Sequence, residues 1–138
     1  MQLVADTNIL VASLLRKGDT RKLLFSKVFE LFAPESITLE ILAHKEEFKQ
    51  KGSMTESEFE TALALELENV TILPVEEYGL LKQKALELCP KGHEDDWPFI
   101  ALALKINCAL WTQDSALKKQ SQVKVFNTTE LLKELTSK

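Results

Sequence analysis

Hydrophobic and polar positions along the chain follow two different periodicities. Short apolar runs that end in turn-forming residues predict strands, and longer segments with apolar residues on one face predict helices. Three strands are clear on this basis, at residues 70–73, 108–112 and 123–126, and a fourth is expected at the start of the chain, over Leu3, Val4 and Ala5. Strands and helices therefore alternate along the sequence.

Capping and helix-breaking residues indicate where the helices begin and end. Ser53 with Glu56 resembles a capping box, as does Asn127 with Glu130, and Pro34 breaks a helical pattern. Four helices are expected with both ends defined, from Asp19 or Thr20 through Leu31, from Glu35 to about Lys51, from Thr55 to about Leu67 and from Glu76 to Leu88. Three further helices are expected to begin at about Ile9, at Asp95 or Asp96 and at Asn127.

The connections between the expected strands are too long for hairpins. Such connections favour a parallel sheet with helices on both faces. The sequence therefore predicts a three-layer α/β/α sandwich with a mostly parallel central sheet. A length of 138 residues is typical of one domain, so a single domain is expected over residues 1–138.

Acidic residues stand where such a sheet binds ligands. In an open parallel sheet, ligands bind beyond the carboxyl ends of the strands. Asp6 ends the first expected strand, and Asp114 follows the strand at 108–112. Asp96 begins the helix that leads into that strand, and Glu40 lies early on the helix that follows Pro34. These four carboxylates are expected to converge at one edge of the sheet.

Four carboxylates in one crevice would repel each other unless a cation lay between them. Hard oxygen ligands suit Mg²⁺ or Mn²⁺. Such an ion would lower the pKa of a bound water and stabilise charge on a scissile phosphate. The pattern is compatible with one metal ion or with two.

Each acid also has a simpler structural explanation. Asp6 and Asp96 could only cap helices, Glu40 could belong to a solvated face, and Asp114 could be a loop residue. The prediction of a metal site therefore depends on the four acids together.

Composition agrees with a globular domain and gives no sign of a membrane segment. Hydrophobic residues make up 45% of the chain and charged residues 28%, and no apolar stretch is long enough to span a bilayer. The first residues lack the basic-then-apolar layout of a signal peptide, because Asp6 interrupts the first apolar run. A cytoplasmic protein is expected.

The net charge of −4 does not exclude a nucleic-acid partner. Without the four candidate ligands, 21 − 4 = 17 acidic residues balance 17 basic ones. Affinity for a phosphate backbone would come from local basic residues such as Arg16, Lys17, Arg21 and Lys22.

Taken in order, these segments resemble the PIN domain, a small metal-dependent nuclease fold that includes the VapC toxins. Its first motif is matched by the opening strand and Asp6-Thr7-Asn8, and its second by Pro34 followed six residues later by Glu40. The segment from Asp95 to Ala103 resembles the third motif, and Leu110-Trp111-Thr112-Gln113-Asp114 resembles the fourth. The matched motifs extend over essentially the whole chain.

The resemblance implies a metal-dependent endonuclease that cleaves single-stranded or structured RNA, commonly as a homodimer. If the protein is a toxin, an antitoxin protein would be expected to cover the acidic crevice. Asp95 competes with Asp96 for the third ligand position, although Asp96 stands immediately before the helix. The resemblance assigns Asp6, Glu40, Asp96 and Asp114 as metal ligands, with Asn8 and Thr112 as residues that orient them.

Two alternatives remain open at this stage. One is a PIN-like module that binds RNA without cleaving it. The other is a receiver-type signalling domain, which would need a phosphoacceptor Asp at the end of a middle strand, whereas the strand at 70–73 ends in Pro74. A zinc hydrolase is disfavoured, because His93 has no partner histidine at ligand spacing.

Overall fold

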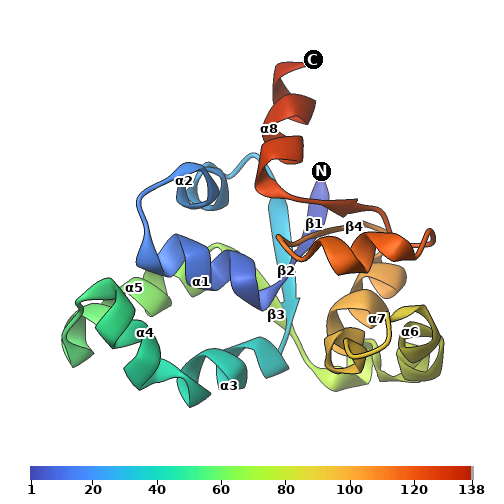
Figure 1. The fold of residues 1–138 in the computed structure, drawn as a ribbon, viewed down its shortest axis with the longest axis horizontal. Helices are drawn as coiled ribbons and strands as arrows, with labels where there is room; N and C mark the ends of the chain where they lie inside the picture. The colour runs from blue at the N-terminus through green and yellow to red at the C-terminus, as the bar shows by residue number, and fades with distance from the viewer. Residues whose placement is uncertain (138) are drawn as a thin grey trace.

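A parallel sheet of five strands runs through the middle of the protein in the computed structural model, which describes residues 1–137 (Figure 1). The strand order is β3-β2-β1-β4-β5, and every neighbouring pair is parallel. The strands are β1 (Gln2–Ala5), β2 (Glu30–Pro34), β3 (Val70–Leu73), β4 (Ala109–Trp111) and β5 (Val125–Phe126).

Helices cover both faces of this sheet, as the alternating pattern predicts. α1 packs against α2, α3, α4 and α5 on one face, while α6 and α7 pack together on the other, where α7 contacts β1, β2 and β4 (Figure 1). The helices are α1 (Thr7–Leu15), α2 (Asp19–Phe25), α3 (Ser36–Ala43), α4 (Lys45–Gly52), α5 (Glu56–Leu67), α6 (Lys82–Leu88), α7 (Trp97–Ile106) and α8 (Thr128–Thr136). Short 3₁₀ turns lie at Val75–Glu77, Gly79–Leu81, Glu94–Asp96 and Ser115–Lys119.

The core lies on both sides of β1. Leu3, Val4 and Ala5 are fully buried. A strand covered on both faces reads as a continuous apolar run, which explains why the first strand can be recognised from sequence. Facing it, α7 buries Phe99 and the small and aliphatic residues that follow, so this helix carries little polar surface. Within residues 1–137, no helix is both long and apolar enough to cross a membrane.

The strand order reverses direction between β1 and β4. The chain proceeds from β1 outward through β2 to β3, then returns to place β4 on the other side of β1. In doubly wound sheets the crevice at such a reversal is where ligands bind. A receiver domain has the order 2-1-3-4-5, so the observed order is not that of a receiver domain.

The prediction that the second helix runs through Leu31 is wrong, because Leu31 belongs to the strand β2. Helix α2 ends at Phe25, and Lys27 adopts a left-handed conformation with φ of 62° that turns the chain toward the sheet. Leu31 then pairs with Leu3 and Val70 in the two neighbouring strands. Burial between two strands outweighs the helical spacing of the apolar residues.

Smaller corrections concern helix boundaries. The segment predicted as one helix from Glu35 to Lys51 is divided at His44 into α3 and α4, and both of these contact α1. The helix predicted from Glu76 begins instead with two 3₁₀ turns. The capping box of α5 pairs Thr55 with Glu58, not Ser53 with Glu56, whereas the box predicted at Asn127 is present.

Candidate metal centre

Asp6 stands at the end of β1, in the crevice between β1 and β4. Its backbone N–H donates to Trp111 O at 3.0 Å, which extends the pairing of the two strands by one residue. Its side chain is 5% exposed. One carboxylate oxygen, Oδ1, accepts the Thr7 N–H at 2.7 Å, and the other, Oδ2, accepts the Thr112 hydroxyl at 2.7 Å. The side chain therefore caps α1 and also faces the crevice.

The Thr112 hydroxyl connects both sides of this crevice. It donates to Asp6 Oδ2 and accepts hydrogen bonds from Asn8 Nδ2 and from the backbone N–H of Asp114, each at 3.0 Å. Asn8 Nδ2 also lies 3.3 Å from Asp6 Oδ2. Thr112 is itself buried at the end of β4. This network fixes the orientation of the Asp6 carboxylate relative to the loop that carries Asp114.

Asp96 and Asp114 face each other across the same edge of the sheet, with His93 between them. His93 Nδ1 lies 3.1 Å from Asp114 Oδ2 and 3.7 Å from Asp96 Oδ2. Asp114 uses its other oxygen to accept the Ala116 N–H at 3.0 Å. The three side chains each offer one ligand atom, and these atoms lie within 4.8 Å of one another.

The two adjacent acids before α7 differ in their surroundings. Asp95 is exposed, whereas Asp96 is half-buried and interacts electrostatically with Asp114 and Glu40. Although Asp96 is the N-terminal flanking residue of α7, its side chain makes no capping hydrogen bond. Its carboxylate is therefore directed at the acidic cluster, and the simpler reading of Asp96 as a helix cap is wrong.

Glu40 reaches the cluster from α3 through a threonine. The Thr7 hydroxyl donates to Glu40 Oε2 at 2.6 Å, and Thr7 is the residue whose backbone N–H binds Asp6. Glu40 is exposed, so this carboxylate lies at the open side of the crevice. All four acids named from the sequence thus lie around one edge of the sheet, with Glu40 the most peripheral.

The electrostatics of the site favour a bound cation. Burial is the main cause that raises the pKa of Asp6 to about 6, and the charges of Asp96 and Glu40 raise it further against the lowering effect of Thr112 and Thr7. Burial and the Asp114 charge also raise the pKa of Asp96. A divalent ion among these oxygens would remove the repulsion between them. The carboxylate oxygens suit Mg²⁺ or Mn²⁺.

The spacing of the ligand atoms agrees with this chemistry. Atoms bound to one ion at about 2.1 Å lie no more than about 4.2 Å apart. The separations of His93 Nδ1 from Asp114 and Asp96 fall within that limit, and the three ligand atoms as a set lie within 4.8 Å, a slightly wider spacing than one ion requires. The residues present therefore fit a small divalent cation.

Sequence reasoning named two residues of this site without giving them a role in it. Thr7 connects Asp6 with Glu40, and its only sequence signal is its position next to Asp6. His93 lies between Asp96 and Asp114, and its signal was the run of three acids that follows it. His44, four residues after Glu40, is exposed, and its Nδ1 lies 3.6 Å from Glu47 Oε1.

A doubly wound parallel sheet with an acidic cluster at its strand reversal defines an α/β protein with a candidate metal site at the carboxyl edge of its sheet. Comparison with known protein families identifies the family, because the family model of the PIN domain matches residues 4–136. The chain belongs to the PIN-domain family. Members of this family are generally metal-dependent nucleases.

A solved structure has the same fold. The chain is similar to one in the crystal structure of VapBC2 from Rickettsia felis bound to a DNA fragment from their promoter, with a TM-score of 0.65 and 19% identity. The match covers 92% of this chain and 98% of that one. No curated protein matches the chain. At this identity the likeness establishes the fold, in agreement with the sheet order and the two helical layers.

Proposed function

We propose that the protein is a Mg²⁺- or Mn²⁺-dependent endoribonuclease. The observation that supports the proposal is a pair of neighbouring acidic groups at one edge of the sheet, Asp96 with Asp114 beside His93 and Asp6 with Glu40 through Thr7, in which the charges of Asp96 and Glu40 raise the pKa of buried Asp6. These four carboxylates would hold the ion. When bound, the ion would supply a water of lowered pKa and a positive charge opposite the scissile phosphate.

The residues of the chain have separate tasks in this proposal. Thr112 and Asn8 hold the carboxylate of Asp6 in one orientation, because both donate to its Oδ2. Thr7 holds Glu40 at the open side of the crevice. The burial of Asp6 strengthens its interaction with a cation, because charges interact more strongly away from bulk water. Asn8 and Thr112 are thus positioning residues.

Substitution of the two neighbouring acids provides a matched test. Purified wild type, Asp96→Asn and Asp95→Asn would each be incubated with labelled single-stranded RNA in Mg²⁺, in Mn²⁺ and in chelator. Cleavage should require the metal, should be lost in Asp96→Asn and should persist in Asp95→Asn, because only Asp96 faces the other acids. Calorimetric titration with Mn²⁺ should show weaker binding for Asp96→Asn alone.

Three outcomes would contradict the proposal or restrict it. Cleavage that persists in chelator would exclude a metal-dependent mechanism. Cleavage lost in Asp95→Asn and retained in Asp96→Asn would show that Asp95, and not Asp96, is the metal ligand. Binding of metal and RNA by the wild type without cleavage would favour a non-cleaving RNA-binding module.

We further propose that the protein is the toxin of a toxin–antitoxin pair and binds an antitoxin protein. Support comes from the fold shared with a chain of the VapBC2 structure. Expression of the chain in a bacterial host should arrest growth, and Asp96→Asn should relieve the arrest. Growth arrest that is identical with both forms would separate toxicity from the acidic cluster.

A homodimer is the proposed assembly. Leu39 and Leu42 lie three residues apart on α3, where side chains share one face of a helix, and are 71% and 47% exposed. A second copy of the chain could cover them. Light scattering should give twice the monomer mass, and Leu39→Lys with Leu42→Lys should give the monomer mass. A wild type that is monomeric at micromolar concentration would contradict this assembly.

A further inference from the structure

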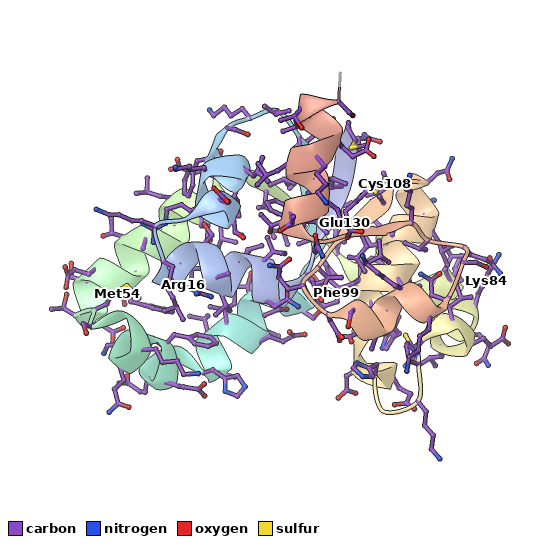
Figure 2. The ribbon with its side chains drawn as sticks, turned by 45° about the horizontal axis from the view of Figure 1, so that its top comes forward. Arg16, Met54, Lys84, Phe99, Cys108 and Glu130 are labelled. Carbon is purple, nitrogen blue, oxygen red and sulfur yellow. The ribbon has the colours of Figure 1, made fainter. Side chains whose placement is uncertain are left out.

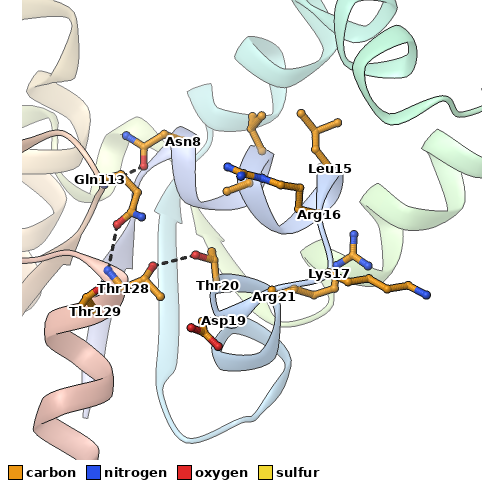
Figure 3. Close-up of a pocket in the computed structure, with 13 residues that line it drawn as sticks. Asn8, Leu15, Arg16, Lys17, Asp19, Thr20, Arg21, Gln113, Thr128 and Thr129 are labelled. Carbon is orange, nitrogen blue, oxygen red and sulfur yellow. Dashed lines mark hydrogen bonds between the residues drawn. The ribbon is translucent and has the colours of Figure 1, made fainter.

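A groove begins beside the candidate metal centre and follows α1 toward its C-terminal end (Figure 3). Its volume is about 670 Å³. Asn8 lines the end next to the acids, and Arg16 and Lys17 line the other end. Residues of α1 and the α1–α2 connection form one side, and Gln113, Thr128 and Thr129 form the opposite side.

A chain of hydrogen bonds fixes the shape of this groove. The Gln113 N–H donates to Asn8 Oδ1 at 3.1 Å, and the Thr128 N–H donates to Gln113 Oε1 at 3.0 Å. The hydroxyls of Thr128 and Thr20 are 2.8 Å apart (Figure 3). These hydrogen bonds connect α1, α2 and α8. Asn8 also donates to Asp6 through Nδ2, so this residue belongs both to the groove and to the surroundings of the candidate metal centre, although none of the acids of that centre lines the groove.

The groove carries more positive than negative charge. Three cations line it, Arg16, Lys17 and Arg21, against one acid, Asp19. Arg21 is engaged in the fold, since its guanidinium donates to the backbone oxygens of Ser13 at 2.6 Å and Leu14 at 3.1 Å. Within residues 1–137, the exposed side chains of Arg16 and Lys17 make no hydrogen bond or ion pair. Two cations are therefore available for an external anion.

We propose that this groove binds the phosphate backbone of a polynucleotide strand, with Arg16 and Lys17 as its phosphate contacts. The inference rests on the proposed nuclease function, which puts a scissile phosphate at the acidic end. Asn8 on α1 and Arg16, the residue that follows this helix, are eight residues apart, about 12 Å along the helix axis, so one strand can contact both ends. Of the described residues that line the groove, none is aromatic, so recognition is of the backbone and not of stacked bases.

Binding measured without catalysis separates this inference from the nuclease activity. Fluorescence anisotropy would follow a labelled single-stranded RNA in chelator, with Asp96→Asn as the parent so that no strand is cut. The test variant adds Arg16→Gln and Lys17→Gln. The matched control adds Lys84→Gln and Lys105→Gln instead, two exposed lysines that do not line the groove; Arg16 and Lys84 lie at opposite sides of the molecule (Figure 2).

The test variant should bind on the order of ten-fold more weakly, and the control should match the parent. The slope of log affinity against log salt should be shallower by about 1.4, twice the roughly 0.7 expected for each phosphate contact on a single strand. Single-stranded DNA of the same sequence should show the same loss if only phosphates are read. A loss confined to RNA would place a 2′-hydroxyl among the contacts.

Equal affinity of the test variant and the parent would overturn the proposal, as would failure of the parent to bind either nucleic acid. Loss of binding to an acidic polypeptide, with nucleic-acid binding unchanged, would assign the groove to a protein partner instead. If the wild type cleaves RNA but the groove variant binds normally, the nuclease stands and the groove assignment falls. If the groove variant loses binding but the wild type never cleaves, the groove assignment stands without the nuclease.

Discussion

Two buried carboxylates, Asp6 and Glu66, lie in contrasting parts of the same fold. Asp6 is 5% exposed at the carboxyl edge of the sheet, and Glu66 is 1% exposed on α5, beside a small pocket shared with α1 and α2. Burial is the main cause of a raised pKa in both, to about 6 for Asp6 and about 8 for Glu66. Burial with a perturbed pKa is therefore not a sufficient signature of a metal site.

The neighbours of the two acids distinguish them. Asp6 accepts hydrogen bonds from Thr7 and Thr112 and is repelled by other acids. The polar neighbours of Glu66 are the Ser13 hydroxyl and the cation Arg21, both of which lower its pKa against the larger effect of burial. A site that gathers several acids needs a cation to be stable, whereas a lone buried acid lowers its cost by becoming protonated. The comparison predicts a catalytic role for Asp6 and none for Glu66.

The largest expected effect is on RNA cleavage by Asp6→Asn. Loss of one metal ligand should remove several kcal/mol of transition-state stabilisation, so the single-turnover rate should fall about 10³-fold. Glu66→Gln should cleave within about two-fold of the wild type, because α5 lies away from the acidic edge. Rates would be measured in saturating Mn²⁺ with labelled RNA. Equal losses in the two variants would remove the distinction between the two acids.

Replacement of Glu66, which should leave cleavage almost unchanged, should have a large effect on the stability of the fold. The folded-state pKa of Glu66 is about 8 against a reference of 4.5, so the unfolded state releases this proton first and the wild type loses stability as pH rises from 4.5 to 8. Glu66→Gln should therefore be more stable than the wild type, by about 3 kcal/mol at pH 7. The gain should vanish near pH 4.

Urea unfolding at several pH values would measure this difference, with Glu68→Gln, an exposed acid two residues further along, as the control. A gain that does not change between pH 4 and 8 would show that Glu66 is not the titrating group. A destabilised variant would mean that Glu66 is charged and paired in the folded protein.

The removal of one hydroxyl tests how the acidic edge is organised. Thr112→Val takes away the donor to Asp6 and the acceptor for Asn8 and the Asp114 N–H. Unpaired buried groups should cost about 2 kcal/mol of stability, and Mn²⁺ affinity should fall by about ten-fold. Thr71→Val, at an exposed position on β3, is the matched control. Unchanged Mn²⁺ affinity in Thr112→Val would mean that this network supports the fold alone.

The parts of this site that sequence could predict are those carried by uninterrupted apolar runs. β1 and β4 are buried on both faces, so their runs stand out, and with them the acids at their ends. β2 could not be recognised in the same way, because Leu31 continues the apolar spacing of the preceding helix, and only the left-handed turn at Lys27 separates the two.

Other features of the site depend on the path of the chain in space. The loop before α7 brings His93 back to Asp114, twenty-one residues away in sequence (114 − 93 = 21), and no local pattern encodes that return. Likewise, Thr7 meets Glu40 only because α1 and α3 pack side by side. The choice between Asp95 and Asp96 also depends on which way each side chain faces, because the two are adjacent residues of the same type.

The smallest expected effect concerns His93, which lies between Asp96 and Asp114 and could act either as a metal ligand or as a cation. An imidazole ligand favours Mn²⁺ over Mg²⁺, which prefers oxygen. If His93 Nδ1 is a ligand, His93→Gln should weaken Mn²⁺ binding by about ten-fold and leave Mg²⁺ binding within about three-fold. Calorimetric titration with each ion would measure both, with His44→Gln, exposed on the other side of Glu40, as the control. If His93 instead neutralises Asp96 and Asp114 as a cation, its loss should strengthen the binding of both ions, since the acids would then repel each other more and gain more from a metal.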